Sequence, residues 1–473
     1  MKFKEALNQI GGLREMAGSL NLLTAVGRRT LDASEWIVDA TMLNALLDEV
    51  EEAADTIENA DSSSLLEKIR LRLMNVRDIP NTISRLSEGE TLDDVELFEL
   101  KGFALVNGKL REYFESLPLI KFETFRLPDL TGALEELDPE QTGSSNFYIY
   151  DSYSEKLALC RKELKKLQSA SDYDENESEV LTAECLRLEA EVREMLSQRL
   201  RPYARDFGLA LERIGKADLV IAKAQFAVDS GLTRPELTTE VQEYRKLWNP
   251  VIKNRLKETG RCFQPVDISF GHGLTLITGA NMGGKSVTLR SVALAQALAQ
   301  FGFYVPAAKA QVVPVAEILQ SIGDGESEQQ GLSSFGAEIV RINSILDKTE
   351  KGTCLVLIDE PARTTNPDEG RAIASALAEI LNQRESFSLM TTHYSLAAPG
   401  CRRLRVRGLR DNLDNTGDFT PGKIAELMDY SLVAETEETD IPHEALRIAR
   451  LIGGETELIR KASRTLENSI RKK

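Results

Sequence analysis

Residues 274–290 read Leu-Thr-Leu-Ile-Thr-Gly-Ala-Asn-Met-Gly-Gly-Lys-Ser-Val-Thr-Leu-Arg, an apolar segment that runs into a glycine-rich turn and then a helical pattern. Gly279, four further residues and Gly284-Lys285-Ser286 match the spacing G-x-x-x-x-G-K-[ST] of a phosphate-binding loop (P-loop). In such a loop, backbone N–H groups surround the phosphates, the Lys reaches the β- and γ-phosphate oxygens, and the Ser ligates Mg²⁺. The stretch therefore predicts a site for ATP and Mg²⁺ between a strand and a helix.

The residues expected to touch the nucleotide extend from the first glycine into the first turn of the helix. They are Gly279, Ala280, Asn281, Met282, Gly283, Gly284, Lys285, Ser286 and Val287. We expect Lys285 to act in catalysis as well, because an ammonium group can neutralise charge on the transferred phosphoryl group. We expect Ser286 to be a metal ligand.

Two further segments carry polar residues at the end of an apolar run. Cys354-Leu-Val-Leu-Ile-Asp-Glu360 ends in two carboxylates. In a P-loop ATPase the first of these, Asp359, would orient Mg²⁺ and its waters, and Glu360 would polarise the attacking water. The second segment ends in His393, whose imidazole could hydrogen-bond the γ-phosphate or that water. The carboxyl ends of parallel strands meet at one sheet edge, where ligands of open α/β sheets bind.

Length and composition set the general class of the protein. At 473 residues, with 42% hydrophobic and 28% charged residues, the chain is too long for one hydrophobic core and predicts two or three domains. No apolar run reaches the roughly 20 residues that span a bilayer, and no signal peptide is visible, so we expect a cytoplasmic protein without membrane contact. The net charge of −17 disfavours non-specific nucleic-acid binding over a large surface. The five scattered cysteines indicate neither a disulfide framework nor a zinc site.

The hydrophobic pattern predicts a multidomain protein, in which an all-α core and lever region at 1–240 precedes an α/β P-loop ATPase domain with a mainly parallel sheet at 241–473. A helical hairpin is expected at 154–201, with apolar residues and two cysteines along its seam, and a short aromatic strand at 146–150. In the second part we expect strands at Leu274–Thr278, Cys354–Ile358, Phe387–Thr391 and Arg402–Arg407, and helices at Lys285–Phe301, Gly336–Leu346, Glu369–Asn382, Glu444–Leu451 and Glu455–Asn468.

A polar, glycine-containing stretch at 321–335 leads into one of these helices, with Ser333 or Ser334 as its N-cap. Because a helix N-terminus also attracts phosphate, these residues could face a nucleotide, either their own or that of a neighbouring subunit.

These motifs resemble the MutS family of ATPases. Thr278–Ser286 is almost the family's loop, with Ala280 in place of its usual Pro, and Thr392-His393-Tyr394 is similar to the family's third motif. The segments Ile322-Gly-Asp, Leu332-Ser-Ser-Phe335 and Asn366-Pro-Asp-Glu-Gly370 look closest to the second MutS branch, whose members act outside mismatch repair. Diffuse similarity to the branch's helical core and lever segments occurs at 78–86 and 222–227.

The resemblance implies a homodimer in which the Ser-Ser-Phe segment of one subunit completes the nucleotide site of the other, with Ser333 in that role here. It also implies that 443–451 is similar to the family's C-terminal helical dimerisation element, and that ATP drives the helical arms on a macromolecular client.

The chain departs from the family in three respects. Residues 1–150 carry no pattern of the mismatch-reading domain, and from a length of 473 residues we expect the small nuclease domain of the second branch to be absent. The family's Leu-Gly-x-Gly-Thr after the acid pair is replaced by Pro361-Ala-Arg-Thr-Thr365. If the two lost glycines adopt positive φ in the family, Ala362 and Thr364 would be strained or the loop would take another path.

Four functions remain open at this point. The first is a DNA-repair-like, dimeric MutS-like ATPase acting on DNA or another macromolecule. The second is an ATP-dependent chaperone or reactivating factor for a protein partner, such as a cobalamin-dependent aminomutase, without DNA binding. The third is a ribosome-acting ATPase, and the fourth a degenerate nucleotide-binding dimer.

Overall fold

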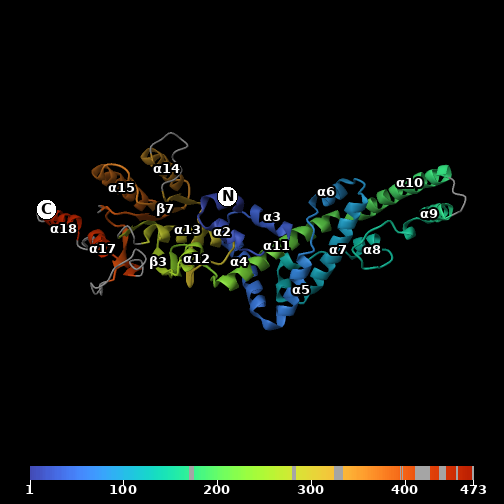
Figure 1. Ribbon diagram of the computed structural model, residues 1–473, viewed down its shortest axis with the longest axis horizontal. Helices are drawn as coiled ribbons and strands as arrows, with labels where there is room; N and C mark the ends of the chain where they lie inside the picture. The colour runs from blue at the N-terminus through green and yellow to red at the C-terminus, as the bar shows by residue number, and fades with distance from the viewer. Residues whose placement is uncertain are drawn as a thin grey trace.

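A computed structural model describes residues 1–169, 175–279, 284–323, 334–394, 396, 398–410, 427–435, 444–453 and 456–470. The molecule is elongated, with the C-terminal helices at one end and a long helical hairpin at the other (Figure 1). The helices before residue 231 are α1 (Phe3–Gln9), α2 (Leu13–Gly18), α3 (Ala25–Ala33), α4 (Ala40–Glu58), α5 (Ser63–Leu73), α6 (Pro80–Glu88), α7 (Asp94–Glu115), α8 (Thr131–Leu137), α9 (Glu155–Gln168), α10 (Glu175–Leu200) and α11 (Ala204–Ser230).

Strands and helices mix in the second part of the chain. Its elements are β1 (Glu236–Leu237), β2 (Gln242–Leu247), α12 (Pro250–Glu258), β3 (Val266–Phe270), β4 (Gly273–Thr278), α13 (Lys285–Gln300), β5 (Lys309–Val312), β6 (Ile318–Ser321), α14 (Ser334–Thr349), β7 (Leu355–Asp359), α15 (Pro367–Asn382), β8 (Phe387–Thr391), β9 (Arg402–Leu409), β10 (Met428–Ala434), α17 (Glu444–Gly453) and α18 (Glu457–Ile470). The predicted strands and helices of this part are therefore present, with bounds that differ by a few residues.

The larger sheet has the strand order β10-β9-β4-β8-β7-β6 and is parallel except for the antiparallel pair β9–β10. Both faces are covered, because alternate residues of one strand join different hydrophobic clusters. Leu276 packs in the cluster that contains α14 and α15, whereas the next residue, Ile277, packs in the cluster that contains α13. Burial on both faces explains why these strands read as continuous apolar runs. A smaller mixed sheet, β1-β5-β2-β3, was not predicted.

The 27-residue helix α11 is the longest in the described chain and packs against α3, α4 and α6. Its buried Asp218 accepts hydrogen bonds from the backbone N–H groups of Leu23 and Thr24 and from the Thr24 hydroxyl. Burial raises the pKa of the Asp218 carboxyl, and the Thr24 hydroxyl and the two N–H groups oppose that shift. Gly27 leaves room for this contact, because a Cβ there would lie 2.3 Å from an Asp218 oxygen.

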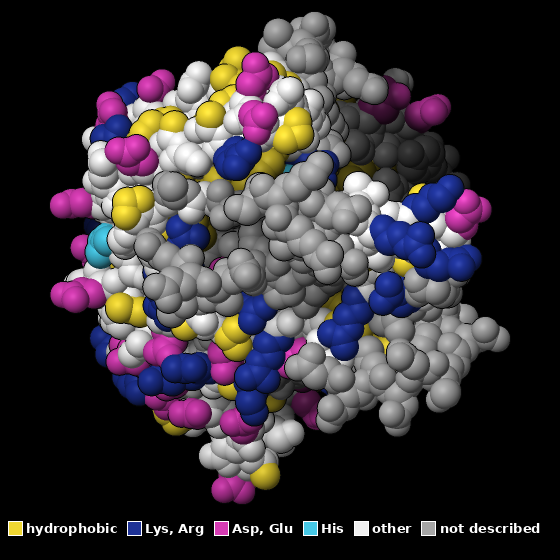
Figure 2. Space-filling model, turned by 90° about the vertical axis from the view of Figure 1, so that its left-hand side faces the viewer, with side chains coloured by type: hydrophobic (Ala, Val, Ile, Leu, Met, Phe, Trp, Pro, Cys, Tyr) yellow, Lys and Arg dark blue, Asp and Glu magenta, His cyan; other side chains and the backbone are white. Residues whose placement is uncertain are grey.

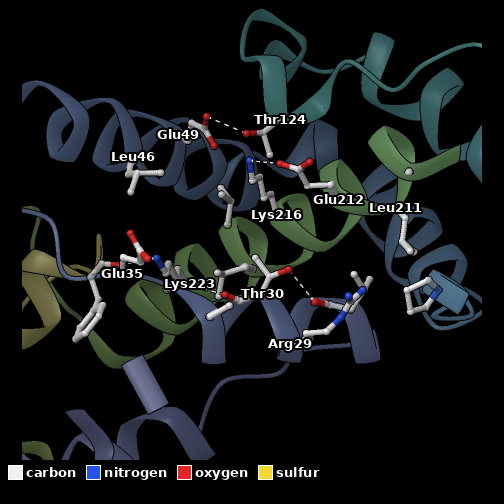
Figure 3. Close-up of a pocket in the computed structure, with 18 of the residues that line it drawn as sticks. Arg29, Thr30, Glu35, Leu46, Glu49, Thr124, Leu211, Glu212, Lys216 and Lys223 are labelled. Atoms are coloured by element: carbon white, nitrogen blue, oxygen red, sulfur yellow. Dashed lines mark hydrogen bonds and ion pairs between the residues drawn. The ribbon is translucent and has the colours of Figure 1, made fainter. Parts of the chain in front are cut away.

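The helical part and the α/β part share one hydrophobic core where α11 and the N-terminal helices meet the end of α13. The Phe301 ring packs edge-on against Phe3 and Trp36, at centroid distances of 4.9 and 5.4 Å. The buried Lys223 of α11 donates a hydrogen bond of 2.7 Å to the Phe301 carbonyl. A pocket of about 670 Å³ opens beside this contact, with Lys223 and Glu49 among its walls (Figure 3).

The hairpin of α9 and α10 follows the predicted seam, and a 3-10 turn at Arg201–Tyr203 separates α10 from α11, as Pro202 indicates. The strand predicted at 146–150 is wrong: these residues form no strand. Within this segment Tyr148 is exposed, whereas Tyr150 is buried. The buried Tyr150 hydroxyl accepts a hydrogen bond of 2.8 Å from Lys101, whose ammonium also pairs with Asp138 at 3.0 Å.

No helix of the described chain is both long enough and apolar enough to cross a membrane.

Candidate functional site

The predicted site residues that the structure describes converge at the carboxyl edge of the larger sheet. β4 leads into Gly279, β7 ends at Asp359 and Glu360, and β8 leads to His393. Gly284, Lys285, Ser286 and Val287 form the start of α13. Ala280, Asn281, Met282, Gly283 and Ser333, which we also expect to contact the nucleotide, lie outside the described residues.

Lys285 connects the loop to the acid pair. Gly284 precedes it with φ of 74°, a left-handed conformation that glycine adopts without strain. The Lys285 side chain is 4% exposed, and its ammonium donates to the Gly279 carbonyl at 2.6 Å and lies 3.0 Å from the Glu360 carboxylate. The buried charge thus has an anionic partner and a carbonyl acceptor, as a buried ammonium requires.

Thr391, the last residue of β8, holds the acid pair in position. Its hydroxyl donates to an Asp359 carboxylate oxygen at 2.6 Å and accepts a hydrogen bond of 2.9 Å from the Glu360 N–H. One side chain therefore orients both acids from the neighbouring strand. The sequence pattern did not single out Thr391, because a threonine at the end of an apolar strand has no distinctive spacing.

The second residue of the acid pair and the loop after it adopt left-handed backbone conformations without glycine. Glu360 has φ of 45° and Ala362 has φ of 59°. Such conformations cost a non-glycine residue about 1–3 kcal/mol and concentrate at functional sites. The strain that we expected at Ala362 is thus present, whereas Thr364 is not among the residues with positive φ in the described chain. The Glu338 carboxylate accepts a hydrogen bond of 3.3 Å from the Ala362 N–H, which helps to hold the loop.

His393 lies beyond β8, exposed to solvent and with its ring 4.1 Å from the Tyr394 ring. Although the side chain is exposed, neighbouring protein atoms desolvate the ring and lower the pKa of His393; the charge of Glu360 opposes this shift, and Lys285 and Arg363 add to it. The imidazole is therefore mainly neutral at pH 7, and can both donate and accept a hydrogen bond.

A pocket of about 780 Å³ extends from the start of α13 and the acid pair. Its polar end contains Lys285, Ser286, Asp359 and Glu360. An apolar wall comes from α12, the segment that runs from Phe263 into β3, and β10: Ile252, Leu256, Phe263, Val266, Met428 and Tyr430. This wall was missed in the sequence because its residues come from three separate segments without a shared motif.

The donor set suits Mg²⁺ only when phosphate is bound. Among the described residues no group of three or more His, Cys, Asp or Glu side chains could hold a metal ion. Mg²⁺ usually takes one or two protein oxygens and completes its shell with phosphates and water, and Ser286 and Asp359 at the pocket offer two such oxygens. The residues present therefore fit a nucleotide-bound Mg²⁺.

Comparison with known proteins identifies the family. The family described as MutS domain V matches residues 275–406, which extend from β4 into β9. "DNA mismatch repair protein MutS" of Thermus thermophilus is 30% identical over 484 aligned positions, which cover 86% of this chain and 56% of the relative. The chain belongs to the MutS family. The MutS domain V match includes every described candidate residue of the site.

Both MutS branches occur among the relatives. "DNA mismatch repair protein MutS" of Thermus aquaticus is 34% identical over 292 positions, covering 58% of this chain and 35% of the relative. "Endonuclease MutS2" of Streptococcus pneumoniae is 29% identical over 341 positions, which cover 70% of this chain and 42% of the relative. The chain thus spans 56% or less of the length of these MutS family relatives.

Proposed function

We propose that this MutS family member is an Mg²⁺-dependent ATPase that uses ATP to move its helical arms on a macromolecular client. The observation that carries the proposal is the convergence of Lys285, Asp359, Glu360 and His393 at one edge of a parallel sheet, beside a pocket of about 780 Å³. The family membership supports it, because relatives bear the names MutS and MutS2.

The contacts of the acid pair suggest how the site responds to nucleotide. Lys285 pairs with Glu360 at 3.0 Å, so Glu360 has a cationic neighbour. Phosphate oxygens at the loop would compete for the same ammonium and release Glu360 to polarise a water molecule. Asp359, held by Thr391, would bind Mg²⁺ with Ser286, and the ion supplies neutralisation of charge on the phosphates. His393 would donate a hydrogen bond to the γ-phosphate or to the water.

A chain of contacting helices connects this site to the hairpin of α9 and α10. These contacts support the proposal that ATP moves the helical arms. α13 begins at Lys285 and ends beside Phe301, whose carbonyl accepts the Lys223 hydrogen bond from α11. The opposite end of α11 leads to the hairpin at the far end of the molecule (Figure 1). A shift of α13 would therefore reach the arms through two helices in direct contact.

Homodimerisation and a DNA client are part of the same proposal. In a dimer, Ser333 of one subunit would complete the nucleotide site of the other, and the segment 443–451 would contribute to the interface. Figure 2 views the end of the molecule that carries α17 and α18, and Lys and Arg side chains gather there in clusters among the acidic ones. The net charge of −17 favours the alternative, an ATP-dependent chaperone of a protein partner.

Two substitutions test the ATPase. Lys285→Ala is expected to abolish nucleotide binding, and Glu360→Gln to bind ATP but hydrolyse it at least 100-fold more slowly, on the order of magnitude of such losses. Lys348→Ala is a matched control, because this exposed Lys pairs with Glu317 away from the pocket. Wild-type hydrolysis by both site variants would refute the ATPase.

Salt-dependent binding distinguishes the clients. A DNA clamp should bind duplex or branched DNA at low salt and lose affinity steeply as salt rises, because bound phosphates release counterions. An absence of binding at low salt would reject the DNA client in favour of a protein partner.

A further inference from the structure

Two cysteines face each other inside the hairpin, at the far end of the molecule from α17 and α18 (Figure 1). Cys160 of α9 and Cys185 of α10 have their sulfur atoms 2.7 Å apart. Both thiols are buried, with exposed fractions of 7% and 6%. All five cysteines of the chain are free thiols, and Cys354, which is also buried, provides a comparison without a partner sulfur in any described contact.

The surroundings of the pair fix one thiol against the other. The Cys160 S–H donates to the Leu181 carbonyl of α10 at 3.5 Å, so its sulfur is anchored to the partner helix. A disulfide needs sulfur atoms about 2.05 Å apart and Cα atoms at a separation that facing helices can offer. The two sulfur atoms, 2.7 Å apart, therefore need to approach by less than an ångström to form the bond.

We propose that Cys160 and Cys185 form a reversible intramolecular disulfide when hydrogen peroxide reaches the hairpin. One sulfur, as the thiolate, attacks a peroxide oxygen, the O–O bond breaks, and hydroxide leaves and becomes water by taking up a proton. The second sulfur attacks the sulfenic acid formed on the first, the S–S bond forms, and a second water leaves. The two thiols thus lose two electrons in total, and one hydrogen peroxide is reduced to two water molecules.

Burial decides which step is slow. It raises the pKa of Cys185 to about 12, and contact with Cys160 adds to the shift, so little thiolate is present at neutral pH. The first step is therefore slow, whereas the second is fast, because the partner sulfur already lies in contact. A fast second step protects the sulfenic acid from further oxidation. The exposed Cys262 has no such protection and should proceed to the sulfinic acid.

The disulfide would tie the two helices of the hairpin together. The linked residues are 25 apart in sequence, and loop-closure entropy for that length predicts on the order of 100-fold slower exchange of α9 and α10 amides that depend on hairpin opening. The arm would become stiffer without any change at the nucleotide site.

Peptide mapping of the full chain tests the proposal. The reduced protein is treated with hydrogen peroxide, its remaining thiols are alkylated with iodoacetamide, and the digest is analysed by mass spectrometry without reduction. We expect a linked pair of peptides containing Cys160 and Cys185, lighter by two hydrogen atoms than the two free peptides and restored by dithiothreitol. Alkylation of both residues as in the untreated protein, oxidation of either alone to the sulfinic acid, or linkage to another cysteine would overturn the proposal.

Two variants complete the test. Cys160→Ser should abolish both the cross-link and the slower hydrogen exchange, whereas Cys354→Ser, a buried cysteine elsewhere, should change neither. Peptide mapping of the wild-type protein tests the disulfide by itself. The proposal can therefore be tested even if one of the variants does not fold. The same cross-link should form in Lys285→Ala, which separates the thiol chemistry from the proposed ATPase.

Discussion

Lys223 offers the sharpest test of how the helical part and the α/β part are joined. Its side chain is buried, and its ammonium donates to the Phe301 carbonyl and lies 4.4 Å from the centre of the Phe303 ring. Burial lowers the pKa of Lys223 to about 7 from its ordinary value of 10.5, and the charge of Glu49 only partly opposes this shift. Replacing Lys223 by Met keeps the length and removes the charge.

The sign and size of the effect follow from proton linkage. Between pH 7 and 10.5 the unfolded chain binds one more proton at Lys223 than the folded chain, so the free energy of unfolding of the wild type rises with pH. The slope is about 1.4 kcal/mol per pH unit, and below pH 7 both states are protonated and the slope from this group vanishes. The buried charge therefore costs the wild type about 4 kcal/mol at pH 7 and about 2 kcal/mol at pH 9.

The substitution also leaves the Phe301 carbonyl without its donor, which costs roughly 1–3 kcal/mol at every pH. We therefore expect Lys223→Met to be more stable than the wild type at pH 7, by roughly 1–3 kcal/mol, and this advantage to fall by about 2 kcal/mol by pH 9. The better test is how much the stability difference between Lys223→Met and the wild type changes from pH 7 to pH 9. The cost of the unpaired Phe301 carbonyl is the same at both pH values and does not affect that change.

Urea unfolding followed by Trp36 fluorescence measures this difference locally. Trp36 packs 5.4 Å from the Phe301 ring, and a Trp248→Phe background removes the second of the chain's two tryptophans. Lys216→Met is the matched control, because this exposed lysine lies two turns earlier on α11 and pairs with Glu212 at the surface. An equal stability difference between Lys223→Met and the wild type at pH 7 and 9 would refute the reasoning.

Three further substitutions test packing and strain by thermal or urea unfolding. Ala362→Gly should raise stability by up to about 1 kcal/mol, because the left-handed φ of 59° favours glycine; a decrease would contradict the strain. Gly27→Ala should cost about 2–3 kcal/mol, because its Cβ would lie 2.3 Å from the α11 carboxylate, whereas Gly102→Ala, with open space around it, should not destabilise. Lys101→Met should cost roughly 3–5 kcal/mol by leaving Asp138 buried without its cation, and a loss under 1 kcal/mol would show that the pair is not buried as described.

The parts of the fold that could be predicted are those in which burial imposes a simple pattern. β4, β7 and β8 are covered on both faces and are therefore largely apolar, so their positions were visible in the sequence. The smaller sheet was not visible, because β2 reads Gln-Glu-Tyr-Arg-Lys-Leu and buries the polar Gln242. Its amide exchanges two hydrogen bonds with the backbone of Val313, a partner 71 residues away that no local pattern indicates.

The candidate site likewise has features that the sequence predicts and features that only the tertiary structure shows. The loop glycines, Lys285 and the acid pair follow from motif spacing, and these residues stay predictions until nucleotide binding is measured. The contact between Lys285 and Glu360, the role of Thr391 and the apolar wall with Tyr430 depend on which strands become neighbours. The wrong strand at 146–150 has a related cause: aromatic content favours a strand, but there it supplies Tyr150 to a buried lysine.

The packing of the N-terminal helices on α13 has a consequence for how the protein is made. A Cβ at Gly12 would lie 3.3 Å from Leu294 of α13, and Phe3 packs against Phe301, so α1 and α2 cover the helix that begins at the phosphate-binding loop. During synthesis α1 and α2 leave the ribosome long before α13 exists. Their apolar faces therefore stay uncovered until α13 has been made. We therefore expect a fragment that begins at residue 241 to expose its α13 surface and aggregate. The α/β part thus depends on contacts with Phe3 and Gly12 for a complete core, and we expect that it does not fold as a separate unit.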